Sequence, residues 1–231
     1  MGSSMQRRLI DCLVQTVGAH ADELTELDRA VGDGDHGLNM QRGFAEVAAQ
    51  VERLAALAPG EALQGIGRIL LMKVGGASGP LYSTLFTALG KAWPTPFELP
   101  AFAAACGAAV DAVRRIGKSD SGQKTLLDVL VPVQRELALG GDGLARRLSA
   151  CAQRSAAATV PMKAIRGRAS YLGDRSIGHM DPGARSAALL IAALCEVWVS
   201  FGDDGADGSG NEGGKGHGNE IGSEGGGKQS G

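Results

Sequence analysis

The chain has 231 residues, of which 44% are hydrophobic, and this is enough for one domain with a buried core. Its formal net charge is −2, and it lacks the basic, aromatic-interleaved patch typical of nucleic-acid binding. The four cysteines lie far apart without CxxC spacing, which argues against a disulfide framework or a zinc site and favours a reducing compartment.

Neither a secretory signal nor a membrane span is expected. The first residues lack the long apolar stretch that precedes a signal cleavage site. The most apolar run, residues 186–201, is too short and too interrupted to cross a bilayer. We therefore expect a cytoplasmic protein with no membrane partner.

Apolar residues recur every three or four positions along most of the chain, which is the spacing of amphipathic helices. This spacing predicts helices over 5–19, 21–30, 38–58, 60–73, 79–92, 98–118, 122–139, 143–164 and 183–201. Alternating strand patterns are scarce, and Pro132 is expected to kink the helix that contains it. The sequence thus predicts an all-α bundle with short connections, formed by residues 1–201.

Residues 202–231 have a different composition. They contain thirteen glycines and almost no apolar side chains, and their net charge is −4. Such a segment cannot bury enough surface to offset the entropy lost on ordering. We therefore predict a disordered, Gly-rich acidic tail.

The first unusual connection contains Asp28, Asp33 and Asp35 among glycines. Two like charges about 4 Å apart repel by roughly 4 kcal/mol at an effective dielectric near 20, and a hard divalent cation such as Mg²⁺ would remove that repulsion. The alternative is a turn in which Asp35 caps a helix beginning near Leu38. The loop does not fit an EF-hand, and its GxGxxG match follows a helix instead of a strand, so neither motif applies.

Three further connections carry the other unusual residues. Glycines 75, 76 and 79 frame Ser78 before a helix, as in an anion site or a tight turn. The segment from Gly122 to Val131 opens a helix whose apolar face could wall an adenine or pack in the core. The last connection, residues 166–185, is long for a compact bundle and carries Arg166, Arg168, Arg175, His179, Asp181 and Arg185.

Together the four stretches resemble the L subunit of dihydroxyacetone kinase, the nucleotide-binding partner in the phosphotransferase-dependent system. The resemblance covers about residues 5–201 and rests on LDRAVGDGDHGLNM, GGASGPLYSTLF, SGQKTLLDVLVPV and GRASYLGDRSIGHMDPGA, in the family's order and at comparable spacing. It implies an antiparallel eight-helix barrel or bundle with a nucleotide site at one rim, where ADP or ATP and two Mg²⁺ ions bind.

The site residues follow from the same resemblance, motif by motif. It implies that Asp28, Asp33 and Asp35 are the metal ligands. The implied phosphate contacts are His36, Gly37, Leu38, Asn39, Ala77 and Ser78. The base or ribose would lie near Gly122 and Val131, and the nucleotide would be covered by the loop that contains Arg175, Asp181, Pro182 and Gly183.

The implied mechanism is a relay between subunits, in which no residue of this chain acts as a nucleophile or base. Bound ADP is phosphorylated in place by a multiphosphoryl donor subunit of the phosphotransferase system. The resulting ATP passes its γ-phosphoryl group to dihydroxyacetone, which a separate K-type subunit holds through a histidine. These two subunits are the expected partners, and a homodimer is left open.

Two alternatives to this relay stay open. One is an L-type subunit of an ATP-dependent kinase for another triose or tetrose ketone, and the other is a non-catalytic nucleotide-binding regulator. The absence of a K domain in these residues favours a separate subunit over the fused ATP-dependent kinases. His36 argues against the related fatty acid kinase domain, which has threonine at that place.

Overall fold

The computed structural model describes residues 3–204, with side chains to residue 200. The predicted tail, residues 202–231, lies outside the described residues except for the last turn of the final helix. Residues 3–204 contain helices and connections but no strand, which confirms the all-α class. The elements are α1 (Ser3–Ala19), α2 (Ala21–Val31), α3 (His36–Ala49), α4 (Val51–Ala55), α5 (Pro59–Lys73), α6 (Ser78–Lys91), α7 (Leu99–Gly117), α8 (Leu127–Leu139), α9 (Leu144–Ala157), the 3₁₀ helix η1 (Arg168–Ser176) and α10 (Pro182–Asp204).

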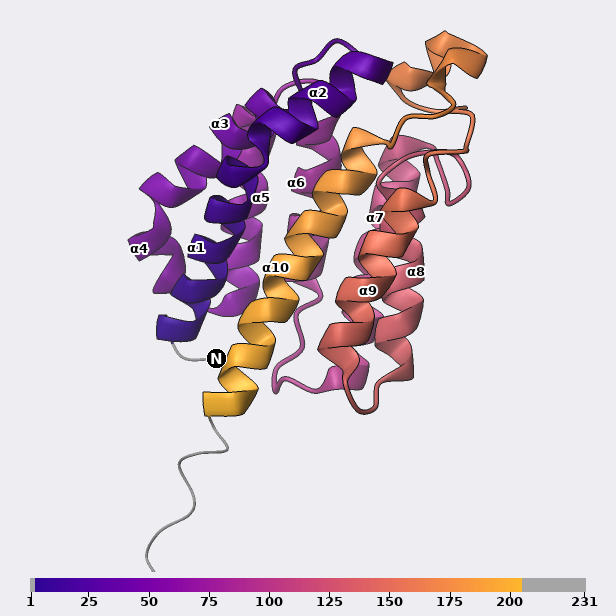
Figure 1. Cartoon of the computed structure of the whole chain (residues 1–231). Coiled ribbons are helices and arrows are strands. Elements are labelled where there is room, and N and C mark those ends of the chain that lie inside the picture. The colour runs from indigo at the N-terminus through magenta and orange to yellow at the C-terminus, as the bar shows by residue number, and fades with distance from the viewer. Residues whose placement is uncertain (1–2, 205–231) are drawn as a thin grey trace, which may run out of the picture.

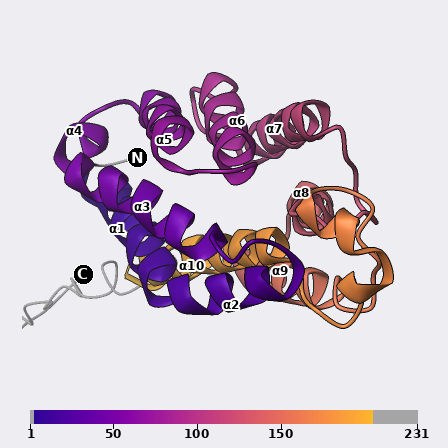
Figure 2. The same cartoon turned by 90° about the horizontal axis from the view of Figure 1, so that it is seen from above.

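Eight helices form a closed ring of neighbours, seen from above in Figure 2. Each helix contacts the next in the order α1, α3, α5, α6, α7, α8, α9 and α10, and α10 contacts α1. Successive helices of the ring run in opposite directions (Figure 1), as short connections require. α2 and α4 lie outside this cycle and connect its members.

The alternating directions bring four connections to one end of the ring. We call this end the upper rim and define it as residues 20–35, 74–77, 118–126 and 158–181, which lie at the top of Figure 1. These are the connections in which the unusual sequence motifs lie. Segments that are far apart in the chain therefore meet because of the helix directions alone.

Three predicted helices end or begin at different places in the structure. The predicted helix 38–58 begins already at His36 and is divided at Gln50 into α3 and α4. The predicted helix 122–139 begins only at Leu127, because Gly122 and Lys124 have positive φ. The predicted helix 143–164 ends at Ala157, before Pro161. α8 continues through Pro132.

The main core lies inside the ring. Its largest fully buried members include Phe44 and Met40 of α3 and Tyr82 of α6. By length and composition, Pro182–Ser200 of α10 could also cross a membrane, but half of that stretch is buried inside the protein. Buried core helices of proteins without a membrane span can have the same length and apolar composition. We therefore interpret α10 as one of the eight helices that form the ring.

Gly37 sets the distance between α2 and α3. A Cβ atom at this position would lie 1.9 Å from the backbone oxygen of Ala21 and 2.4 Å from Oγ1 of Thr25. We expect Gly37→Ala to lower the free energy of unfolding by about 1–3 kcal/mol, because backbone atoms would have to move. Urea denaturation would measure this change.

Gly18→Ala is the matched control, because the space around Gly18 is open and the residue lies within α1. This substitution is expected to be neutral or to raise stability by about 0.5–1 kcal/mol. Equal effects of the two substitutions would contradict close packing at Gly37.

Candidate functional site

The four connections of the upper rim surround a cleft of about 130 Å³. Its walls come from the acidic turn, the glycine turn before α6, the segment before α8 and the long connection before α10. The lining residues are Asp28, Val31, Asp33, Asp35, His36, Gly75, Gly76, Ala77, Ser78, Leu81, Lys124, Thr125, Leu126, Arg166, Gly167, Arg168, Ala169, Asp181, Pro182 and Gly183. All four sequence motifs thus contribute to one site.

Three carboxylates converge at one side of the cleft. An oxygen from each of Asp28, Asp33 and Asp35 lies within 4.8 Å of the other two. Asp28 is buried, Asp35 is half-buried and Asp33 is exposed. Such a set of hard oxygen donors fits Mg²⁺, which binds carboxylates and completes its shell with water and phosphate oxygens.

Asp28 is held by the backbone of the turn that follows it. Its Oδ2 accepts hydrogen bonds from the backbone N–H groups of Asp35 (2.9 Å) and His36 (3.1 Å). A Cβ at Gly32 would lie 2.3 Å from the other carboxylate oxygen of Asp28, so any larger residue there would displace this carboxylate. Asp35 stands at the N-cap of α3, as the alternative interpretation expected, but its side chain makes no cap hydrogen bond and lines the cleft with Asp28 and Asp33.

Arg168 connects the long connection to the acidic turn. Its guanidinium forms an ion pair with the carboxylate of Asp33. Nη2 of the same side chain would lie 3.8 Å from a Cβ on Gly76, so the charge lies between the carboxylates and the glycine turn. Both groups of this ion pair are about half exposed.

The glycine turn offers an anion site at the start of α6. Gly76 has φ +62°, which favours glycine, and Ser78 is the first residue of the helix. Free backbone N–H groups at such a helix start attract phosphate. Ser78 Oγ lies 2.9 Å from Nδ1 of His36, and Nε2 of His36 lies 2.9 Å from Ser186 Oγ.

Lys124 fastens the last two connections of the rim to each other. Its side chain is buried, and Nζ lies 2.6–3.0 Å from the backbone oxygens of Thr159, Met162, Ser176 and His179. Burial lowers the pKa of its ammonium group. The ammonium group of Lys124 donates its hydrogen bonds to these carbonyls and not to the space of the cleft. Lys124 therefore holds the wall of the cleft in place.

Two further aspartates shape the walls. Asp128 accepts hydrogen bonds from the backbone N–H groups of Gly122 and Thr125, which folds the segment before α8. Asp181 caps α10 through a 2.7 Å hydrogen bond from the N–H of Ala184. Burial raises the pKa of Asp181 to about 7, and the nearby carboxylates of Asp128 and Asp28 act in the same direction.

The sequence-predicted residues divide into two groups. The lining includes Asp28, Asp33, Asp35, His36, Ala77, Ser78, Asp181, Pro182 and Gly183. The remaining predicted residues, Gly37, Leu38, Asn39, Gly122, Val131 and Arg175, do not line the cleft. Their direct contact with a ligand therefore has no support from the geometry of the cleft.

The reasons differ among residues of this second group. Gly37 packs against α2, and Val131 is buried in the core. Leu38 points outward and is 55% exposed. Asn39 is buried, and its amide oxygen accepts a hydrogen bond from Arg42.

Leu126 and Arg168 line the cleft, whereas Val131 and Arg175 were expected there. Leu126, and not Val131, contributes the apolar wall after Lys124, since the helix begins five residues later than predicted and Val131 faces the ring interior. Arg168, and not Arg175, reaches the cleft from η1. Helical spacing alone could not separate the two arginines, because η1 is a kinked 3₁₀ segment with Gly173 at positive φ.

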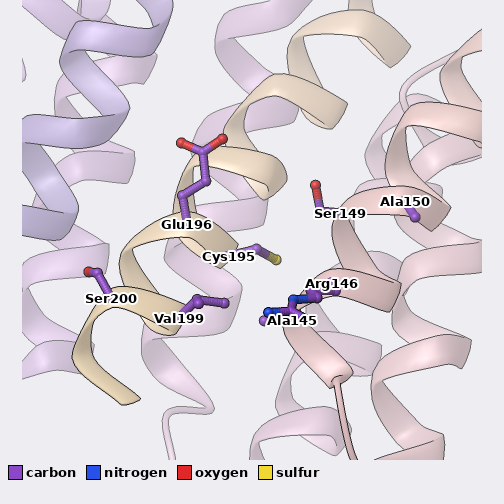
Figure 3. Close-up of a pocket in the computed structure, with 8 residues that line it drawn as sticks. All are labelled: Ala145, Arg146, Ser149, Ala150, Cys195, Glu196, Val199 and Ser200. Carbon is purple, nitrogen blue, oxygen red and sulfur yellow. The ribbon is translucent and has the colours of Figure 1, made fainter. Parts of the chain in front are cut away.

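A larger cavity of about 580 Å³ lies elsewhere, between α9 and α10 (Figure 3). It is lined by Ala145, Arg146, Ser149, Ala150, Cys195, Glu196, Val199 and Ser200. In Figure 3 the side chain of Glu196 points away from Arg146, so the two charges do not converge on a common point. This cavity lacks the set of convergent polar groups found at the upper rim.

Comparisons with known proteins agree with the chemistry of the upper rim. Residues 30–196 match the model of the DAK2 domain. The chain is 40% identical over 178 residues to the PEP-dependent dihydroxyacetone kinase 1, ADP-binding subunit DhaL of Listeria innocua, covering 77% of this chain and 87% of the relative. It is 41% identical over 185 residues to the PEP-dependent dihydroxyacetone kinase, ADP-binding subunit DhaL of Escherichia coli, covering 75% and 87%.

A solved structure is also similar. The dihydroxyacetone kinase of C. freundii in complex with AMP-PNP and Mg²⁺ matches with a TM-score of 0.68 and 26% identity. The match covers 84% of this chain and 34% of that one, so the present chain corresponds to about a third of the larger kinase.

The raised pKa of Asp181 predicts a pH dependence of stability. Between about pH 4 and 7 the folded protein holds a proton that the unfolded chain has lost, so stability falls as the pH rises. Asp181→Asn keeps a cap acceptor but cannot titrate. We expect the free energy of unfolding of the wild type, relative to Asp181→Asn, to decrease by roughly 1–4 kcal/mol from pH 5 to pH 8.

Urea denaturation of both proteins without Mg²⁺ at the two pH values would measure this difference. A difference that is constant or grows with pH would contradict a buried, protonated Asp181.

Proposed function

The chain belongs to the DAK2 domain family, and from this premise we propose that it is the nucleotide-binding subunit of a dihydroxyacetone kinase. The observation that carries the proposal is the convergence of three carboxylates, within 4.8 Å of one another, beside a glycine turn at a helix start. Two close relatives bear the name of ADP-binding subunit. We propose a cytoplasmic location for this subunit.

The lining residues suit an ADP–Mg²⁺ complex. Asp28, Asp33 and Asp35 would hold two Mg²⁺ ions, which would offset the charge of the phosphates. The backbone N–H groups of Ala77 and Ser78 would donate to phosphate oxygens. Arg168, already between Asp33 and Gly76, would add a charged donor in the place first expected for Arg175.

Leu126 and Leu81 provide the apolar part of the cleft, where a base would pack. The connection with Asp181, Pro182 and Gly183 closes the cleft from the side of α10. Lys124 holds this connection in place through its four carbonyl contacts. No lining residue needs to act as a nucleophile, because positioning and charge compensation carry phosphoryl transfer.

We propose the relay as the setting for this site. Bound ADP would receive a phosphoryl group from a phosphotransferase-system donor subunit, and the ATP formed would phosphorylate dihydroxyacetone on a K-type subunit. The two relatives named above are PEP-dependent systems, which favours this donor over free ATP. Use of ATP with another triose or tetrose ketone is the competing version.

Asp33 offers a direct test of the metal site. Its side chain is exposed and pairs only with Arg168 in the described structure, so its replacement should leave the fold intact. We expect Asp33→Asn to weaken ADP binding in the presence of Mg²⁺ by at least about tenfold, which corresponds to ~1.4 kcal/mol. Isothermal titration calorimetry measures the affinity, and circular dichroism reports the helix content.

Asp174→Asn is the control, because this exposed carboxylate lies on η1 outside the cleft and pairs with Lys163. It should bind ADP as the wild type does. EDTA should abolish ADP binding to the wild type; affinity that is unchanged by EDTA would contradict the metal site.

Reconstitution distinguishes the two versions of the relay. The ADP-loaded chain is incubated with a K-type subunit and dihydroxyacetone, and either phosphorylated donor subunit or free ATP is supplied. We expect sustained product formation only with the donor subunit, because ADP retained in the cleft must be phosphorylated in place. Turnover with ATP alone at an equal rate would favour the competing version.

A further inference from the structure

The ammonium group of Lys124 holds both ends of one loop. The four backbone oxygens around Nζ come in two pairs, one from residues before η1 and the other from its last residue and the turn beyond it. They belong to Thr159 and Met162, at 3.0 Å each, and to Ser176 and His179, at 2.6 Å each. We call residues 163–175, which lie between the two pairs, the η1 loop.

Along its length the η1 loop makes small contacts with the ring. In the apolar cluster that joins it to α2, the loop contributes Ala164, Ala169 and the half-buried Leu172, which together bury little apolar surface. Gly167 and Gly173 have positive φ, and the space around both is open. The position of the loop over the cleft therefore depends on how its two ends are held.

Hydrogen bonds also join the two ends directly. The N–H of Ala164 donates to Oγ of Ser176 at 2.9 Å, and the N–H of Gly178 donates to the backbone oxygen of Val160 at 2.8 Å. These bonds close the loop. Lys124 in addition joins both ends to the segment before α8, because it belongs to that segment.

The backbone at position 124 favours glycine over lysine. Lys124 has φ +61°, a left-handed conformation that residues with a side chain rarely adopt. Its side chain is also 1% exposed, so a charge is buried there among carbonyl oxygens. Glycine would avoid both costs, and the lysine thus indicates a role at the loop ends.

We propose that Lys124 is a positioning residue that holds the η1 loop over the cleft, with Arg168 beside the acidic turn, and thereby slows the release of a bound nucleoside diphosphate. The inference rests on the proposed function, in which Arg168 contacts the phosphates. Lys124 lines the cleft, but its ammonium group donates to the loop ends, so it acts through the loop.

The test measures how fast a fluorescent ADP analogue, methylanthraniloyl-ADP, leaves the full chain in the presence of Mg²⁺ when excess ADP is added. Lys124→Gly removes the side chain and suits the positive φ. We expect release about tenfold faster than from the wild type, because charged hydrogen bonds at the loop ends are lost. Lys124→Met keeps an unbranched apolar side chain without the ammonium group and should also release the analogue faster. Circular dichroism should show the helix content of the wild type in both variants.

Chemical rescue separates positioning from a general loss of structure. Butylammonium matches the side chain that Lys124→Gly lacks, so it should slow release again in this variant and leave the wild type unchanged. 1-Butanol has a similar length but no ammonium group, and it should not slow release. Lys118→Gly is the matched control, because Lys118 also has positive φ, is exposed and does not line the cleft; its release rate should equal that of the wild type.

Release at the wild-type rate from either folded variant of Lys124 would overturn the proposal. Faster release from Lys124→Gly that butylammonium does not slow would overturn it as well. A wild type that does not bind the analogue with Mg²⁺ would instead refute the proposed function.

Discussion

Three carboxylates held within 4.8 Å of one another repel strongly, and the structure of the upper rim compensates for this repulsion. Two backbone N–H groups at the start of α3 stabilise Asp28, and the guanidinium of Arg168 stabilises Asp33. The compensating groups are backbone N–H groups and an arginine side chain from another connection. In the proposed complex, Mg²⁺ held by the aspartates would compensate the charge of Asp33, and Arg168 would be available to the phosphates.

The ring brings these partners together. Asp28 belongs to α2, Ser78 begins α6, Lys124 precedes α8, and Arg168 lies between α9 and α10. Their connections meet because alternate turns of an antiparallel ring fall at one end. Hydrogen bonds and ion pairs then fix the side chains: His36 joins three helices, and Lys124 joins two connections.

The sequence was sufficient to predict the helical class, the four connections that line the cleft and the acidic cluster, because periodicity and clustered aspartates are local signals. It could not predict Lys124, whose four carbonyl partners lie 35–55 residues away and have no side-chain signature. It also placed Val131 and Arg175 at the site where the structure has Leu126 and Arg168. Those differences depend on where a helix begins and how a 3₁₀ segment bends, which spacing does not specify.

The even number of helices in the ring has a practical consequence. α1 begins and α10 ends at the end of the ring opposite the cleft, as Figure 1 shows. A label placed on the first turn of α1 or the last turn of α10 would therefore lie on that side. The molecule could be immobilised on a sensor surface through either of these helix ends with its cleft facing the solution.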